Sequence, residues 1–297
     1  MFFISAGCSY SQVPNTDLTW PVHVQKELGL ENHEVQHTAI GASGNKLISR
    51  RVIHYVLKAL KTHKPEDLLV GIMWSGCDRH TLLLQENPKT YNNCTKLQMM
   101  PDTYAEFLKE KKGILSDRMF FNNPVATGDV AQFNHYILNA HWNDVLTTTY
   151  YNNFVDGLGS IVQTCEDILR TEWFLKQHNI KYFMTEYDFD TFFYAGIPDH
   201  FAKLYGYDDD CPALQSNADT HKCDVHHPDI EHLYNMIDKD YWLPINNLGD
   251  WAKNVSKFDF RAPDDPHPST KQHKDFTNQI ILPFIRDKYG ISKPQLP

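Results

Sequence analysis

Residues 67–75 read Asp-Leu-Leu-Val-Gly-Ile-Met-Trp-Ser, an apolar run with one polar residue at each end. A strand with one exposed face alternates apolar with polar residues, whereas a strand that helices cover on both faces stays apolar throughout. The stretch therefore predicts a central strand of a parallel sheet.

Two further strand patterns precede this run. Residues 2–6 are apolar up to Gly7, and residues 34–40 lead into the turn Gly41-Ala42-Ser43-Gly44. Helices are expected between the strands, the first beginning at Thr19-Trp20-Pro21 and the second spanning residues 45–61. The second helix has an apolar residue at every fourth position: Ile48, Val52, Val56 and Leu60.

The same alternation returns later in the chain. Residues 150–178 have helical periodicity, residues 180–186 resemble a fourth strand, and Ser269 with Gln272 forms a capping-box start for a last helix. Strands alternating with helices favour right-handed crossovers. We therefore predict an α/β protein, a three-layer α/β/α sandwich with a parallel sheet of about five strands, as is typical of such folds.

Two stretches break this rhythm. Residues 79–142 are polar and rich in Asn, Tyr, Met and Phe, and residues 188–250 are irregular. We expect one domain over residues 1–297 with insertions near 79–142 and 188–250 that flank the carboxyl edge of the sheet.

Composition excludes several classes of protein. Of the 297 residues, 41% are hydrophobic and 22% charged, which excludes a disordered chain. The net charge of −9 argues against a sequence-independent nucleic-acid binder, which needs excess Lys and Arg. The sequence shows neither a signal-peptide pattern nor a run of about 18 apolar residues that could cross a membrane. We expect a cytoplasmic protein whose six cysteines are free thiols.

Two motifs carry residues suited to catalysis. Ser9 follows the first strand in Gly7-Cys8-Ser9, where a strand-to-helix turn can present a hydroxyl at the carboxyl edge of the sheet. His267 precedes the last helix, three residues after Asp264. A carboxylate in that position can hold one imidazole nitrogen while the other accepts a proton from a serine.

These motifs, with Gly41-Ala42-Ser43-Gly44 between them, resemble the SGNH (GDSL-type) hydrolases in order and placement. The resemblance implies a flavodoxin-like sandwich with Ser9 as nucleophile, His267 as general base and Asp264 as its partner. It also implies an oxyanion hole that includes the backbone N–H groups of Ser9 and Gly44.

The third family segment, Gly-x-Asn-Asp, departs from the pattern. Cys77 occupies the position of the Asn that donates to the oxyanion. A thiol is a weak donor, and loss of one oxyanion donor can cost about 10²–10³ in rate. Cys77 or Ser75 remains a candidate for this hole, and Arg79 is a candidate for reaching the hole or the substrate.

A loop rich in histidine could ligate a metal. His221, Cys223, His226 and His232 have ligand chemistry suited to zinc, but their spacing matches no standard zinc motif. We interpret this segment as a solvated loop and expect neither a metal nor another cofactor.

The resemblance implies hydrolysis of an ester through an acyl-serine. Aromatic residues gather in the predicted insertions, which tilts the expected substrate toward a carbohydrate O-acetyl ester or another small acyl ester. A glycan or small-molecule ester would then be the partner, without nucleic acid or membrane. Two alternatives stay open: a catalytically degenerate SGNH-like module that binds a glycan or a protein, and an acyltransferase on the same fold.

Overall fold

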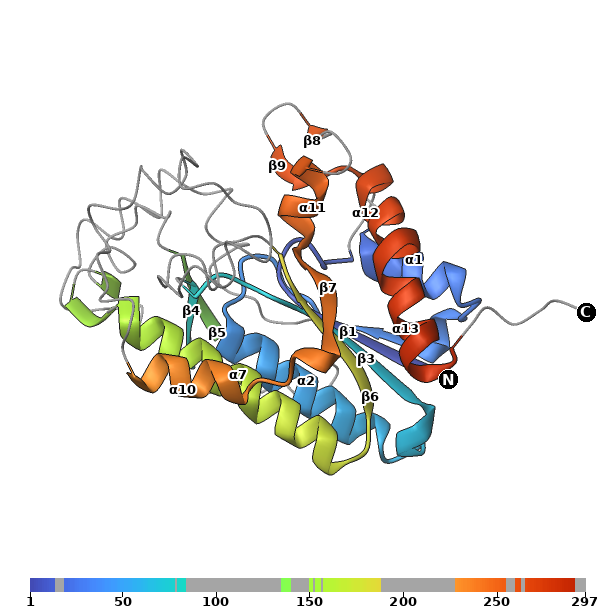
Figure 1. The fold of residues 1–297 in the computed structure, drawn as a ribbon, viewed down its shortest axis with the longest axis horizontal. Coiled ribbons are helices and arrows are strands. Elements are labelled where there is room, and N and C mark those ends of the chain that lie inside the picture. Colours follow the sequence, from blue (N-terminus) through green and yellow to red (C-terminus); the bar gives the residue numbers. More distant parts are fainter. Residues whose placement is uncertain are drawn as a thin grey trace, which may run out of the picture. The chain divides into compact units, whose positions relative to one another are not determined.

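The fold is an α/β sandwich around a parallel sheet of five strands (Figure 1). The structure, a computed structural model, describes residues 1–13, 19–77, 79–83, 135–139, 150–151, 153–155, 157–187, 228–254, 260–262 and 265–291. The strands run in the order β2-β1-β3-β6-β7. Their bounds are β1 (Phe2–Ala6), β2 (Val35–His37), β3 (Leu68–Trp74), β6 (Lys181–Glu186) and β7 (Trp242–Asn247).

All four pairings in this sheet are parallel. The strand order has the flavodoxin-like form. The chain first adds β2 on one side of β1 and then adds all later strands on the other side, beginning with β3. The predicted three-layer sandwich is therefore confirmed. β3 lies in the middle and all seven of its residues are buried, as its apolar run predicts.

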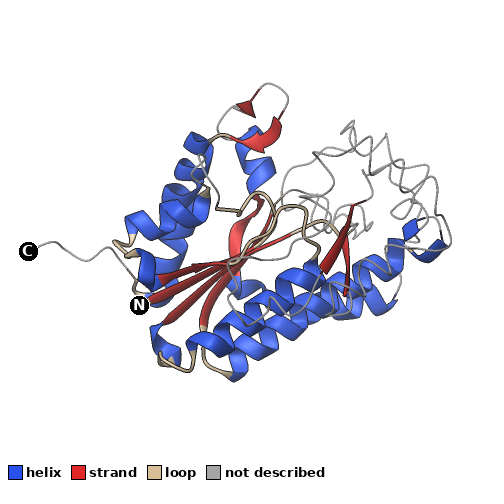
Figure 2. Ribbon diagram, turned by 180° about the vertical axis from the view of Figure 1, so that it is seen from behind, coloured by secondary structure: helices blue, strands red, loops and turns tan. Residues whose placement is uncertain are grey.

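Helices cover both faces of the sheet, as the views from either side show (Figures 1 and 2). One face carries α2 (Asn45–Ala59) and α7 (Gly157–Gln177), and α10 (Pro228–Met236) packs on α7. The other carries α1 (Trp20–Glu27) and α13 (Leu282–Tyr289), together with α12 (Thr270–Phe276), which continues through a π-helical turn at Thr277–Ile281 into α13. Short 3₁₀ turns are η1 (Asn32–Glu34), η2 (Pro65–Asp67) and η4 (Lys239–Tyr241).

The core under α1 and α12 is built around a glycine of β3. A Cβ at Gly71 would lie 2.5 Å from Phe183 Cζ and 2.9 Å from Trp20 Cη2, so only glycine lets these two rings cover the central strand. The Trp20 and Phe183 rings meet edge to face with centroids 5.8 Å apart. Phe3 and Phe276 extend the same buried cluster.

The second predicted insertion ends earlier than expected. Residues 228–250 contain α10, η4 and β7, and they lead into α11 (Leu248–Asn254). These residues belong to the sandwich, and β7 is the fifth strand of its sheet. Of the predicted insertion 188–250, residues 188–227 lie outside the described part of the chain.

The chain divides into two compact units, one of residues 1–78 and 156–297 and the other of residues 79–155. The second unit includes the antiparallel pair of β4 (Arg79–Leu83) and β5 (His135–Asn139). Within it the His80 ring lies 5.6 Å from the rings of both Tyr150 and Tyr151. The predicted insertion 79–142 falls inside this unit.

None of the helices in the described ranges combines the length and apolar composition that crossing a bilayer requires.

A partly buried ion pair within α7 lies where this helix contacts α2. The side chain of Asp167 in α7 is only 4% exposed, and it accepts a 2.7 Å hydrogen bond from Arg170 Nη2. Arg170 also donates to Ser49 in α2 at 2.8 Å. Burial raises the pKa of Asp167 to about 6, because the desolvation of its carboxylate outweighs the attraction of Arg170 and other nearby cations.

This raised pKa predicts a specific pH dependence of stability. The folded protein holds the Asp167 proton more tightly than the unfolded chain, whose Asp pKa is near 3.8. The free energy of unfolding contributed by Asp167 should therefore fall as pH rises from about 4 to about 6, and stay level above. In wild type the free energy of unfolding should fall by about 2–3 kcal/mol more over this pH range than in Asp167→Asn. The measurement is urea denaturation of both proteins at a series of pH values.

The matched control for this experiment is Asp275→Asn, which removes the pair between Asp275 and the exposed Lys271. The control should keep the wild-type slope between pH 4 and pH 6. Parallel stability curves for wild type and Asp167→Asn would contradict the assignment.

Candidate active site

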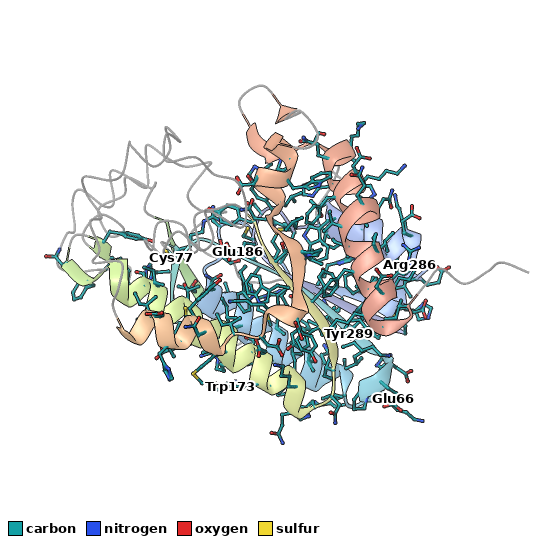
Figure 3. The ribbon with its side chains drawn as sticks, in the orientation of Figure 1. Glu66, Cys77, Trp173, Glu186, Arg286 and Tyr289 are labelled. Atoms are coloured by element: carbon teal, nitrogen blue, oxygen red, sulfur yellow. The ribbon has the colours of Figure 1, made fainter. Side chains whose placement is uncertain are left out.

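The candidate site lies at the carboxyl edge of the sheet. Because the five strands are parallel, the segments that follow β1, β3 and β6 all leave the sheet at this edge. Ser9 follows β1, Cys77 follows β3, and Tyr187 follows β6. Figure 3 shows Cys77 and Glu186, the last residue of β6, at the same end of the sheet.

Gly7 sets the turn that presents Ser9. A Cβ at Gly7 would lie 2.9 Å from the Met73 carbonyl oxygen and 2.8 Å from Ser11 Cβ, so a side chain cannot be accommodated there. The turn closes with a 3.0 Å hydrogen bond from Ser11 N–H to the Cys8 carbonyl. Ser9 is left half-buried at the tip of this turn.

Cys8 is fully buried in the hydrophobic core. A cysteine side chain behaves as a small apolar group in such a core.

The second loop packs directly against the first. A Cβ at Gly41 would lie 3.9 Å from Ser9 Cβ and 2.8 Å from Gln12 Oε1. Ser43 Oγ donates to the carbonyl of Gly7 at 3.1 Å. This loop ends at Gly44, which is buried and is the N-cap residue of α2. The positive end of the α2 dipole therefore begins beside the segment that carries Ser9.

Asn45 fixes the third loop, a role that the sequence did not reveal. Its side chain accepts a 2.7 Å hydrogen bond from Ser75 N–H and donates a 2.9 Å bond to the Ser75 carbonyl. The same amide donates to Thr164 Oγ1 in α7 at 3.2 Å. All three residues are buried. In the sequence, the only indication of this role was the position of Asn45 directly after Gly44.

Ser75 and Cys77 differ in how far their side chains are exposed. Ser75 is fully buried, whereas Cys77 is half-buried and outside any disulfide. Of the two candidates for the third oxyanion donor, Cys77 is therefore the more accessible to a ligand.

His267 reaches Ser9 from the other end of the chain. It lies in β9 (Asp265–Pro268), which pairs with β8 (Phe260–Ala262) just before α12. His267 Nε2 lies 2.7 Å from Ser9 Oγ, a hydrogen bond between residues 258 positions apart. In the tautomer protonated at Nδ1, the Ser9 hydroxyl donates to Nε2, the arrangement required of a nucleophile and its base. Asp264 lies outside the described residues.

Ser269 supports the position of His267. Its hydroxyl accepts from Gln272 N–H, and the Gln272 side chain accepts from Ser269 N–H, so the predicted capping box is confirmed. The N-cap of α12 is therefore fixed two residues after His267.

Two tyrosines lie next to the Ser9–His267 pair and were not predicted as part of the site. The Tyr10 and His267 rings have centroids 4.8 Å apart, and Tyr10 meets the edge of Tyr187 at 5.1 Å. Both tyrosines are buried. No sequence pattern distinguishes them, because the contacts join three distant segments.

The remaining predicted residues are Arg79 and the candidate metal ligands. Arg79 begins β4 in the second compact unit. Among the candidate metal ligands, His221, Cys223 and His226 lie outside the described residues, and His232 is exposed on α10. Within the described ranges no group of three or more His, Cys, Asp or Glu side chains is arranged to hold a metal ion.

Comparisons of the chain with protein-family models, with curated proteins and with solved structures found no match. The chemistry proposed for this site therefore rests on its own geometry and on the motifs in the sequence.

Proposed function

We propose that the protein is a serine hydrolase that cleaves an ester through an acyl-serine intermediate. The observation that carries this proposal is the 2.7 Å hydrogen bond between Ser9 Oγ and His267 Nε2 at the carboxyl edge of the sheet. A turn serine often bonds to a local backbone group. Here it meets an imidazole from the far end of the chain, at the edge where open α/β sheets bind ligands.

In the proposed reaction, Ser9 Oγ attacks the ester carbonyl carbon while its proton passes to His267 Nε2. The tetrahedral intermediate collapses, the bond to the alcohol oxygen breaks, and His267 returns the proton to the leaving alcohol. Water then attacks the acyl-serine with His267 again acting as base, which releases the acid and restores Ser9. Asp264 is the proposed partner of Nδ1, from its position three residues before His267.

The developing negative charge needs hydrogen-bond donors. We assign this role to the backbone N–H groups of Ser9 and Gly44, the second at the positive end of α2. Asn45 supports this arrangement because it ties the loop after β3 to the same end of α2. Cys77 stands where SGNH hydrolases have an Asn, so the third donor is weak.

For the substrate we propose a small acyl ester, with a carbohydrate O-acetyl ester as the specific class. The aromatic residues of the predicted insertions support this choice, since flat rings line many pockets for apolar or ring-shaped ligands.

Hydrolysis of p-nitrophenyl acetate tests the proposal. Ser9→Ala removes the nucleophile and His267→Gln removes the base, so each should lower kcat/KM by about 10³-fold or more. The matched controls are Thr62→Ala, which removes an exposed hydroxyl, and His33→Gln, which removes an exposed imidazole. Both controls should keep wild-type turnover. Equal turnover by wild type, Ser9→Ala and His267→Gln would instead favour a non-catalytic binding module.

The departure at Cys77 gives a second prediction. Cys77→Asn supplies an amide donor in place of a weak thiol donor, and should raise kcat by about tenfold or more. Cys77→Ser, with a shorter hydroxyl, should give a smaller gain. The measurement is kcat for the same ester at saturating concentration. A kcat that Cys77→Asn leaves unchanged or lowers would show that this position does not face the oxyanion.

A further inference from the structure

We infer that Tyr10 is a positioning residue for His267, and that its ring stabilises the charged imidazolium. This inference rests on the proposed function for its catalytic meaning, but the contact itself can be tested without turnover. The Tyr10 ring lies against the imidazole with centroids 4.8 Å apart and the planes inclined at 44°. The distance falls within the roughly 6 Å over which a cation is attracted to an aromatic ring.

Tyr10 is itself held in place. Its side chain is buried, and Tyr187 meets it at 79° with centroids 5.1 Å apart. Tyr187 is fixed by its backbone, which donates to the Trp74 carbonyl at 3.0 Å and accepts from Gly249 N–H at 2.9 Å. The His267 imidazole therefore packs against the Tyr10 ring. Tyr10 in turn packs against Tyr187, whose backbone is hydrogen-bonded to β3 and to α11.

Neighbouring residues hold the imidazole in two different ways. Ser9 forms a hydrogen bond with Nε2, whereas Tyr10 makes a ring-to-ring contact with the imidazole. When Ser9 gives up its proton, His267 becomes a cation beside the Tyr10 ring. The electrostatic attraction to that ring should then be stronger than in the neutral state, which lowers the barrier to attack.

Tyr10 apart, the ionisable residues on the elements that contact His267 and β9 are the same in every variant compared. Ser9 and Tyr10 are in the first loop, and Tyr187 lies behind Tyr10 at the end of β6. The elements packed against β9 carry further charges. By their positions in the sequence these are Arg261 in β8, Asp265 in β9, Asp250 and Lys253 in α11, and Lys271, His273, Lys274 and Asp275 in α12, whereas Asp264 lies outside the described residues.

The experiment is an NMR titration of His267 in the full chain with isotopically labelled histidine. His267→Gln identifies its signal among the 16 histidines. Tyr10→Leu keeps apolar volume but removes the ring, so the pKa of His267 should fall by about 0.4–0.7. Tyr10→Phe keeps the ring and should restore the wild-type pKa. Replacing Tyr10 by a trifluorinated phenylalanine keeps the shape, weakens the attraction to cations, and should lower the pKa of His267 relative to Tyr10→Phe.

The fluorinated ring keeps the test decisive if Tyr10→Leu fails to fold. Equal pKa values for His267 with phenylalanine and with its fluorinated form would overturn the inference, as would a fall with Tyr10→Phe as large as with Tyr10→Leu. In ester hydrolysis, Tyr10→Leu should lower the plateau of kcat/KM by about two- to fivefold, whereas Tyr10→Phe should not. If no variant hydrolyses esters yet the pKa values shift as expected, the contact stands and the proposed function fails.

Discussion

Trp20 joins the two segments that carry Ser9 and His267, one through its indole and the other through its backbone. Its Nε1 donates a 2.8 Å hydrogen bond to Ser11 in the Ser9 turn, and its backbone carbonyl accepts from Thr277, in the helix that follows His267. The ring is fully buried over Gly71 of the central strand. A buried polar N–H without a partner would be costly, so the Ser11 bond fixes both the ring and the turn. The meeting of residues 258 positions apart depends on this packing.

A second set of buried hydrogen bonds, made by Asn45, stabilises the carboxyl edge of the sheet. Asn45 satisfies both backbone groups of Ser75 and also donates to Thr164, so direct buried hydrogen bonds hold α2, α7 and the loop after β3 together. Buried hydrogen bonds of this kind are costly to lose, because each leaves an unsatisfied group inside the protein. Together with the Trp20 packing, they hold the loops at this edge on rigid elements, which favours precise placement of reacting groups.

Much of this arrangement follows from local sequence patterns. The runs that form β1, β3 and β6 are short and alternate with helical patterns, which favours strands over buried helices. The capping box at Ser269 marks a helix start by itself. β7 was missed because it contains Pro244 and two asparagines, which weaken any strand pattern. Proline is tolerated there because, among the strands that the structure describes, β7 lies at the edge of the sheet and pairs with β6 alone.

The site was predictable only in part. Ser9 and His267 could be named because each occupies a characteristic place beside a regular element. Asn45, Tyr10 and Tyr187 could not, because their roles arise from contacts between distant segments and leave no periodic signature in the sequence.

The central claim is that His267 activates Ser9 as a nucleophile. Its most direct test is exposure of the folded protein to a fluorophosphonate, followed by mass spectrometry of the intact chain and of its peptides. We expect one adduct per chain, located on Ser9, and its loss in His267→Gln. The absence of any adduct on the folded wild-type protein would contradict the claim, as would an adduct on Ser11 or Ser43 in place of Ser9.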